Sequence, residues 1–306
     1  MPIHHEFQGC ELDDLGALRL RGVDVVRFLQ GQLSCDVQRL APERSLLAGY
    51  HNPQGRVIAL LRLVQLADGD VLALVPRELA GPVAQRLAKF VLRSKVTVTD
   101  ASAHWRIGGL IAESSADTVA LPPSADSQGR VGATTVVCVG ERPARYLEIS
   151  SNTEPRQPEL PPAAPAGRER WRELDIHAGL PQVYAATSEQ FVAQMLNLDV
   201  IGAVDFDKGC YTGQEVIARA HYRGRVKRRL QRFRSRGPLE LTPGHGGSLP
   251  DGRSFTVIEA VRLADGRCEF LAVARLPGAE PESAGGSDGR KPIDVETLEL
   301  PYALPA

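Results

Sequence analysis

Paired cysteine spacing, long apolar runs and an excess of either charge are all missing from this 306-residue sequence. The cysteines number five, stand far apart and form no C-x-x-C pair. An odd number of scattered cysteines favours reduced thiols over a disulfide framework. It also supplies no complete ligand set for a zinc or iron–sulfur centre, so we predict no resident metal. The five are Cys10, Cys35, Cys138, Cys210 and Cys268.

No stretch approaches the roughly 18 uninterrupted apolar residues of a membrane span, and residues 1–11 have no apolar signal core. We therefore expect a cytoplasmic protein without a membrane partner. The charges nearly cancel, since 36 Lys and Arg stand against 37 Asp and Glu, a net charge of −1. Because the chain is no polycation, its bulk charge does not imply nucleic acid. Hydrophobic residues at 43% and charged residues at 24% are typical of a globular protein of two or three domains.

Short apolar runs alternate with turn residues through the first hundred positions. Asp24 precedes a helical apolar pattern and is placed to cap that helix. Two apolar runs flank Asp68 and Gly69, which predicts a β-hairpin. The succession of strand, strand, helix and strand indicates an α+β lobe with an antiparallel sheet. The predicted elements are strands at 17–21, 57–66, 71–75 and 95–99 and helices at 24–29 and 77–93.

The second half of the chain begins with a region that predicts a connector. Residues 151–167 carry five prolines among small and polar residues, which is typical of an exposed linker. Beyond position 230, alternating runs at 255–263 and 268–274 flank an Asp-Gly pair at 265–266. This pattern predicts a small antiparallel barrel or sandwich.

The densest group of reactive and permissive residues is the octapeptide K-G-C-Y-T-G-Q-E at 208–215. Its two glycines allow backbone angles that other residues resist. Lys208, two positions before Cys210, would favour the thiolate, which is the form that reacts and binds metal. Gln214 and Glu215 add an amide and a carboxylate that can form hydrogen bonds with a polar heterocycle. The alternative interpretation is a tight turn around a buried, inert cysteine.

At every position this octapeptide resembles the K-G-C-Y-[TI]-G-Q-E signature of the YgfZ family, folate-binding proteins linked to iron–sulfur cluster assembly and tRNA modification. That family is similar to the T-protein, the aminomethyltransferase of the glycine cleavage system. Segments 22–37, 171–181 and 298–304 also resemble family patterns, while the resemblance is thin between 100 and 167.

The resemblance implies an α+β, T-protein-like folate-binding fold of two N-terminal α+β lobes plus a C-terminal antiparallel β-barrel. On this basis we expect a folate-binding region of two α+β lobes at 1–225, either consecutive or interleaved along the chain, with the connector near 151–167. The barrel is expected at 226–306.

The resemblance further implies tetrahydrofolate or a derivative as the cofactor. An indole is a good face on which to stack a pterin, and the alternative for Trp171 is a core tryptophan. A folate carboxylate tail would lie near Arg223. The residues expected to bind the cofactor are Trp171, Tyr211, Gln214, Glu215, Arg223 and Asp199.

One position departs from the pattern, because T-proteins have a glutamate where this chain has His177. A carboxylate can accept two adjacent N–H groups of a pterin, whereas a neutral imidazole offers a single acceptor. Either another carboxylate substitutes or folate binds more weakly. The candidates for substitution are Asp175, Glu173, Asp199 and Glu215.

Three functions compete. The first is a folate-binding accessory factor for assembly or repair of iron–sulfur clusters, acting on client proteins through Cys210 and Lys208. The second is folate-dependent aminomethyl transfer, which is disfavoured because Ala59 and Leu60 stand where T-proteins have an acidic pair. The third is an RNA-binding or scaffold module that uses the basic run 219–236. Within that run no aromatic residues alternate with the basic ones to stack on bases, so we do not expect nucleic acid as a partner. The alternative interpretation of the run is a charged strand at the edge of a sheet.

Overall fold

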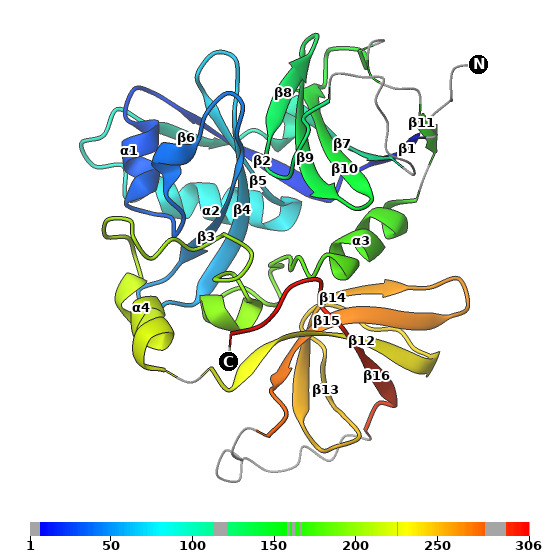
Figure 1. Ribbon diagram of the computed structural model, residues 1–306. Helices are drawn as coiled ribbons and strands as arrows, with labels where there is room; N and C mark the ends of the chain where they lie inside the picture. Colours follow the sequence, from blue (N-terminus) through cyan, green and yellow to red (C-terminus); the bar gives the residue numbers. More distant parts are fainter. Residues whose placement is uncertain are drawn as a thin grey trace.

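Three β-sheets organise the chain (Figure 1). The computed structural model describes residues 7–112, 121–157, 160, 163–165, 167–224, 226–278 and 292–305. Helices are few and short beside the sheets, so the fold is of the mixed α+β class. The helices are α1 (Val25–Gln30), α2 (Arg77–Ala88), α3 (Arg168–His177) and α4 (Gln214–Arg223), with short 3-10 turns at Val37–Arg39, Ser102–His104 and Ala193–Leu196.

The first sheet has six strands in the order β11-β1-β7-β10-β9-β8, and the second has five in the order β3-β4-β5-β2-β6. All neighbours are antiparallel except the pair β1 and β11. The chain leaves the first sheet after β1, builds the second sheet with β2 to β6, and then returns. The strands of the first sheet are β1 (Phe7–Glu11), β7 (Trp105–Ala112), β8 (Gln128–Val131), β9 (Thr134–Glu141), β10 (Ala144–Ser151) and β11 (Ala163–Pro165). Those of the second are β2 (Leu15–Arg21), β3 (Leu46–His51), β4 (Val57–Gln65), β5 (Val71–Pro76) and β6 (Thr97–Asp100).

The third sheet is antiparallel, with the order β13-β14-β15-β12-β16. The Ile293 amide, two residues before β16, donates to the Ser248 carbonyl of β13 at 2.9 Å, but no strand pairing between β13 and β16 is described. Within the described residues the strands therefore form an open sheet that does not close into a ring. We keep a domain boundary at 225/226 as a proposal, and Arg225 itself lies outside the described residues. The strands are β12 (Arg228–Pro238), β13 (Gly246–Ser248), β14 (Ser254–Arg262), β15 (Arg267–Arg275) and β16 (Val295–Leu298).

Most of the predicted elements of the first hundred residues are confirmed. β4 and β5 form the predicted hairpin, and Gly69 at its turn has φ +83°, a conformation that glycine adopts readily. α2 is shorter than the predicted 77–93, because the chain beyond Ala88 leaves helical bonding for tight turns. Asp24 stands at the N-cap position of α1 but does not cap it, since its carboxylate accepts from the Lys95 amide at 2.7 Å.

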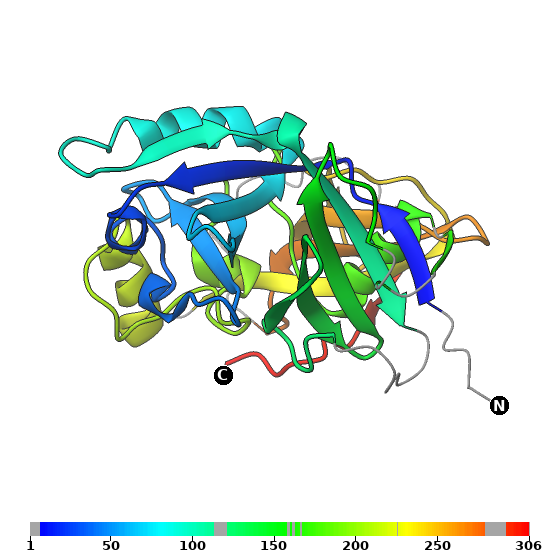
Figure 2. The same ribbon diagram turned by 90° about the horizontal axis from the view of Figure 1, so that it is seen from above.

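Two hydrophobic cores hold the sheets together. One lies around the second sheet, where α2 runs along one face (Figure 2) and buries Leu79, Val83 and Leu87. The other joins the first and second sheets through Ile107, Leu74 and Trp171 of α3. The predicted connector 151–167 contains five positions, 158, 159, 161, 162 and 166, that lie outside the described residues. None of the described helices combines the length and the apolar character that crossing a bilayer requires.

Candidate functional site

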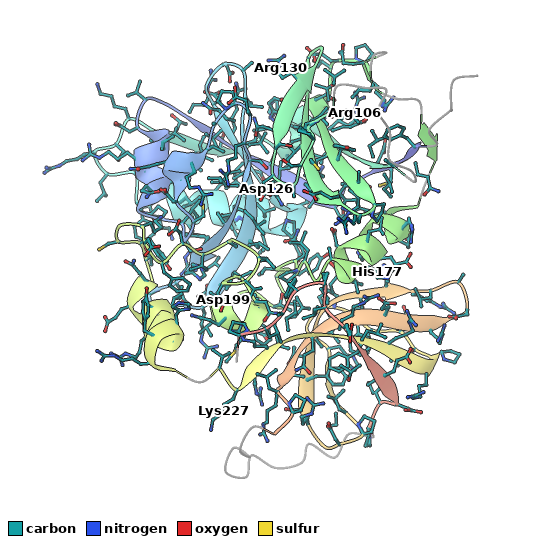
Figure 3. All side chains as sticks on the ribbon, in the orientation of Figure 1. Arg106, Asp126, Arg130, His177, Asp199 and Lys227 are labelled. Carbon is teal, nitrogen blue, oxygen red and sulfur yellow. The ribbon has the colours of Figure 1, made fainter. Side chains whose placement is uncertain are left out.

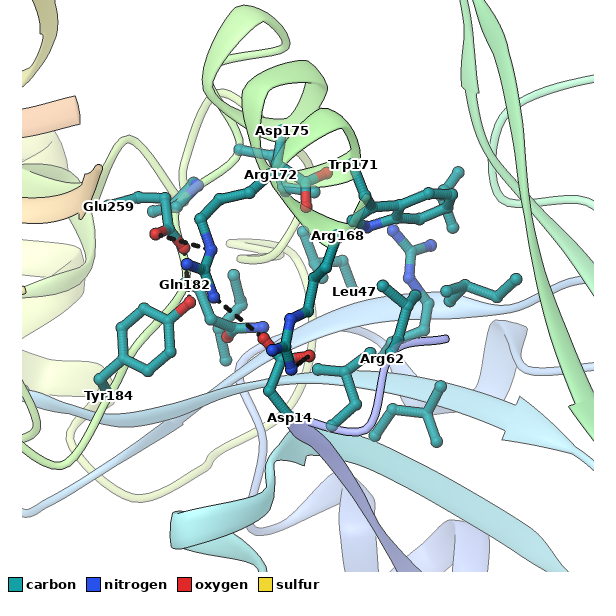
Figure 4. Close-up of a pocket in the computed structure, with 18 residues that line it drawn as sticks. Asp14, Leu47, Arg62, Arg168, Trp171, Arg172, Asp175, Gln182, Tyr184 and Glu259 are labelled. Carbon is teal, nitrogen blue, oxygen red and sulfur yellow. Dashed lines mark hydrogen bonds and ion pairs between the residues drawn. The ribbon is translucent and has the colours of Figure 1, made fainter. Parts of the chain in front are cut away.

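A pocket opens where the three sheets meet α3, and it encloses about 780 Å³ including its mouth (Figure 4). Its apolar wall is formed by leucines and Trp171. Its polar wall is formed by charged side chains from α3, β4, β14 and the loop before β2. The apolar residues are Leu12, Leu15, Leu47, Leu60, Leu74, Val139, Leu147, Trp171, Leu180 and Pro181, and the polar ones are Asp14, Arg62, Arg168, Arg172, Asp175, Gln182, Tyr184 and Glu259.

Trp171 reaches the pocket from α3, but most of its ring lies in the core. The side chain is 6% exposed. A Cβ atom at Gly109 would lie 2.5 Å from the indole ring, so the ring packs directly on the backbone of β7. The Arg145 guanidinium lies 5.1 Å from the ring centroid on a cation–π contact. Trp171 therefore lines the pocket and at the same time supports the contact between sheets.

Arg168 and Arg172 project from α3 towards the loop before β2. Arg172 donates to the Asp14 carboxylate at 3.0 Å, and an Arg168 nitrogen lies 3.8 Å from the same carboxylate. Arg168 also pairs with Asp13. This side of the pocket is therefore lined by guanidinium groups whose partners are partly exposed carboxylates.

Glu259 enters the pocket from the third sheet because β14 carries a register shift between Val257 and Glu259. A bulge of this kind turns a side chain to a new direction. Its Oε2 accepts from the Tyr184 hydroxyl at 2.5 Å, its Oε1 accepts from the Ala260 amide, and Arg172 Nε lies 3.4 Å from that oxygen. Burial raises the pKa of the Glu259 carboxyl to about 7, although Arg172 opposes the shift.

Asp175 is the carboxylate of α3 that faces the pocket. Its Oδ1 accepts from Arg145 Nη1 at 2.6 Å, and Arg145 is almost completely buried. Within the described part of the chain, Oδ2 makes no hydrogen bond and remains an available acceptor. Burial raises the pKa of Asp175, and the neighbouring Arg145 opposes that shift.

Of the four carboxylates considered as substitutes for the T-protein glutamate, Asp175 alone lines this pocket. Glu173 accepts from Arg170 on the same helix, and Glu215 is exposed beside Arg219. Asp199 makes two 3.0 Å bonds to Arg229, and both side chains are 4% exposed.

His177 itself lies outside the pocket, at the end of α3 that meets the third sheet (Figure 3). Its Nε2 is 3.1 Å from Glu269 Oε1. Burial alone would raise the pKa of Glu269, but His177 and Arg232 together lower it to about 2. The imidazole thus contributes to the contact between α3 and β15.

The octapeptide 208–215 forms a loop that leads into α4, away from α3 in both Figures 1 and 2. Lys208 is directed into the protein, where its ammonium donates to three carbonyls, those of Gln30, Leu33 and Cys35, at 2.6–2.8 Å. Burial lowers the pKa of Lys208. The ammonium therefore fixes the segment after α1 beneath the loop.

Cys210 is exposed, which rules out the interpretation of the octapeptide as a turn around a buried cysteine. The other four cysteines are buried or half-buried, and burial raises the pKa of each thiol, to about 12 for Cys35 and about 11 for Cys10 and Cys268. Tyr211, next to Cys210, is buried with the Lys208 ammonium 5.1 Å from its ring centroid.

Gly213 allows the loop to dock on the turn before β4. Its φ is +83°, and a Cβ there would lie 2.5 Å from the Asn52 carbonyl oxygen, so only glycine fits without strain. Gln214 Nε2 lies 3.5 Å from the Lys208 carbonyl oxygen, and Arg223 is exposed at the far end of α4.

Apart from Asp199, which pairs with Arg229 of β12, the predicted site residues fall into two places. One is the loop with α4, which gathers Lys208, Cys210, Tyr211, Gln214, Glu215 and Arg223, and the other is the pocket with Trp171. β4 links them, since its first residues follow the turn that contacts Gly213, and Leu60 in its middle lines the pocket. Leu60 is five positions beyond Gly55, which corresponds to about 16 Å of extended chain.

The basic run 219–236 is divided by the structure. From Arg228 on it is strand β12, where Arg229 pairs with Asp199, Arg232 and Arg234 pair with Glu269, and Arg236 pairs with Asp294. Arg225 lies outside the described residues. The strand part of the run thus serves the fold and forms no free basic patch.

Sequence reasoning missed most of the polar wall of the pocket. One signal was available, because Arg168, Trp171, Arg172 and Asp175 are spaced three and four apart and so share one face of a helix. No such signal existed for Asp14, Tyr184 and Glu259, which come from other parts of the chain.

Comparisons with known proteins identify relatives of the chain and of its fold. No protein-family model matches the chain. The "tRNA-modifying protein YgfZ" of Shigella sonnei is 33% identical over 311 residues, covering 96% of this chain and 92% of that protein, and the protein of the same name from Escherichia coli K12 gives the same values. The fold is similar to that of aminomethyltransferase T of the glycine cleavage system from Bartonella henselae, with a TM-score of 0.67 at 12% identity over 89% of this chain and 79% of that one.

Proposed function

Since the chain belongs to the YgfZ family and has the T-protein-like fold, we propose that it is a folate-binding accessory factor for iron–sulfur proteins. In this proposal the pocket at α3 holds a reduced folate, and Cys210 acts on clusters or clients. The relatives are named as tRNA-modifying proteins, so the proposal includes tRNA modification as a process that this role serves.

The chemistry of the pocket supports a folate. A pterin is a flat ring with adjacent N–H donors, and the pocket offers apolar walls, an indole edge and the available Oδ2 of Asp175. The glutamate tail of folate is anionic, and Arg168 lies partly exposed on the same face of α3. When bound, the folate would supply one-carbon chemistry, while these residues would bind and orient it.

The exposure of Cys210 is the observation that carries the iron–sulfur part of the proposal. A thiol must be accessible to reach a cluster or a client protein, and thiolate is the protein ligand that iron–sulfur chemistry uses. Among the five cysteines, Cys210 is the exposed one. Lys208 supports this role by fixing the loop through three carbonyl bonds.

Aminomethyl transfer is not the function that the pocket favours. Ala59 is completely buried, and Leu60 presents an apolar side chain to the pocket where T-proteins have the second of two acids. Neither can accept a proton or stabilise a developing positive charge.

Tetrahydrofolate titration followed by calorimetry tests the binding part. Asp175→Asn should weaken binding about tenfold to hundredfold, because a hydrogen bond to a charged group contributes about 1.5–3 kcal/mol. Glu173→Gln on the same helix is the matched control and should bind as the wild type does. Since Asn leaves Arg145 without its charged partner, a thermal melt must show that the variant is folded, and Arg168→Gln provides a second, more exposed test. If both variants bound tetrahydrofolate with wild-type affinity, folate would not bind in this pocket.

Genetic complementation tests the sulfur part. Cys210→Ser should fold and bind folate normally, yet fail to restore activity of a [4Fe–4S] dehydratase in cells that lack the protein. Cys10→Ser is the control, because that thiol is half-buried in β1. Full rescue by a folded Cys210→Ser protein would contradict a role for the sulfur.

A further inference from the structure

Apolar side chains gather at one outer edge of the second sheet. The described residues expose six large hydrophobic side chains, and four of them lie in or beside two loops there: Val23 (86% exposed), Leu92 (85%), Phe90 (47%) and Val26 (37%). The first loop, 22–24, joins β2 to α1, and the second, 89–96, joins α2 to β6. We call these two loops and the outer side of α1 the edge tip.

The two loops form one surface because their backbones touch. The Lys95 amide donates to Asp24 Oδ2 at 2.7 Å. Gly22 has φ +124°, and a Cβ there would lie 2.0 Å from the Lys95 carbonyl oxygen. Pairing of Arg21 with Thr97 continues the contact into β2 and β6. The two loops therefore form a fixed scaffold for the exposed side chains, and together with α1 they lie at the outer edge of the molecule in Figures 1 and 2.

Basic side chains outnumber acidic ones around this apolar group. Arg27, Lys89, Arg93 and Lys95 are exposed, and none of them makes an ion pair within the described residues. The acid of the edge tip, Asp24, is engaged with the Lys95 amide. An apolar centre with a cationic rim fits an anionic partner, and it disfavours a second copy of this chain because the two rims would repel.

The shape and chemistry of the edge tip select among anionic partners. Val23 and Leu92 protrude almost completely, so a partner must admit aliphatic side chains to a depth of several ångströms. Nucleic acid offers stacking surfaces, which aliphatic side chains use poorly. The boundary between headgroups and acyl chains of a bilayer admits such side chains, while cations beside them meet lipid phosphates.

We propose that the edge tip docks on an anionic lipid surface, with Val23, Leu92 and Phe90 inserted and the four cations against phosphate groups. This inference goes beyond the proposed folate function and does not depend on it. Docking would hold the protein at a membrane peripherally, without a spanning helix. It would revise the expectation of no membrane partner, which rested on the lack of a spanning segment.

Co-sedimentation of the full chain with vesicles tests the proposal. Vesicles of phosphatidylcholine and phosphatidylglycerol in equal parts should bind the protein, and binding should fall with added salt. Vesicles of phosphatidylcholine alone should bind much less. Leu92→Ser should lower the partition coefficient about tenfold or more through lost apolar burial, and Arg93→Gln about fivefold.

Val216→Ser is the matched control, since Val216 is an exposed valine on α4. It should bind vesicles as the wild type does. Thermal melts and folate titration of each variant should be unchanged, because the substituted side chains are exposed. No binding to the anionic vesicles, equal binding to both vesicle types, or wild-type binding by Leu92→Ser would each overturn the proposal. Saturable binding to single-stranded RNA that Leu92→Ser abolishes, without binding to vesicles, would assign the edge tip to nucleic acid instead.

Discussion

Substitution of Asp199 can test whether this residue binds folate or stabilises the fold. It was expected to bind folate, yet it lies outside the pocket and makes a bidentate pair with Arg229, each bond 3.0 Å long. Arg229 also donates to the Gln194 carbonyl at 3.0 Å and lies 3.3 Å from Asn197 Oδ1. The pair therefore joins the segment 194–199 to β12 of the third sheet. We expect Asp199→Ala to reduce stability and leave folate affinity unchanged.

The size of the effect follows from burial. Both side chains are 4% exposed, so removing the carboxylate leaves a guanidinium in the interior with neutral partners alone. Breaking a buried pair in this way costs about 3–5 kcal/mol, a large part of a typical total of about 5–15 kcal/mol. Replacing both partners by apolar residues is often neutral. The double variant Asp199→Ala/Arg229→Met should therefore recover most of the loss.

Urea unfolding followed by tryptophan fluorescence gives the free energies of the wild type, the two single variants and the double variant. The cycle isolates the coupling between the two side chains. Folate titration is then performed under conditions in which each variant is folded. If Asp199→Ala left the free energy of unfolding unchanged but weakened folate binding, the structural role would be refuted. Asp199 would then be a residue of the cofactor site.

Three further outcomes are expected. Trp171→Ala should lower the free energy of unfolding by about 3–5 kcal/mol, because the ring packs on β7; a urea melt with a loss below about 1 kcal/mol would contradict this. Glu259 has a pKa raised to about 7 from 4.5, so stability should fall as the pH rises between these values, and Glu259→Gln should remove that dependence in a pH series of melts. No aminomethyl transfer to tetrahydrofolate should occur, since Leu60 replaces an acid at the pocket; measurable turnover in a one-carbon transfer assay would refute this.

Local patterns in the chain were sufficient for much of the architecture. The hairpin of β4 and β5 and the strands β14 and β15 follow from alternating apolar runs around Asp-Gly turns, which are short-range signals. The octapeptide was recognisable because its glycines and its cysteine are adjacent in the sequence. The length of α2 was less predictable, since apolar residues at helical spacing continue to Val91 while the hydrogen bonding of the helix ends at Ala88.

By itself the sequence determined the family, the α+β class and the position of the octapeptide, because each of these depends on patterns among residues that are close together in the chain. Only the tertiary structure decided which side chains share the pocket: Glu259 arrives from β14 through a bulge, and Asp14 arrives from the loop before β2. It also decided the partners of long charged side chains. Lys208 binds carbonyls 173 to 178 residues away and Arg229 binds Asp199. A charged side chain that is buried needs a partner, and this follows from the residue type. Which partner lies within reach is decided by the fold.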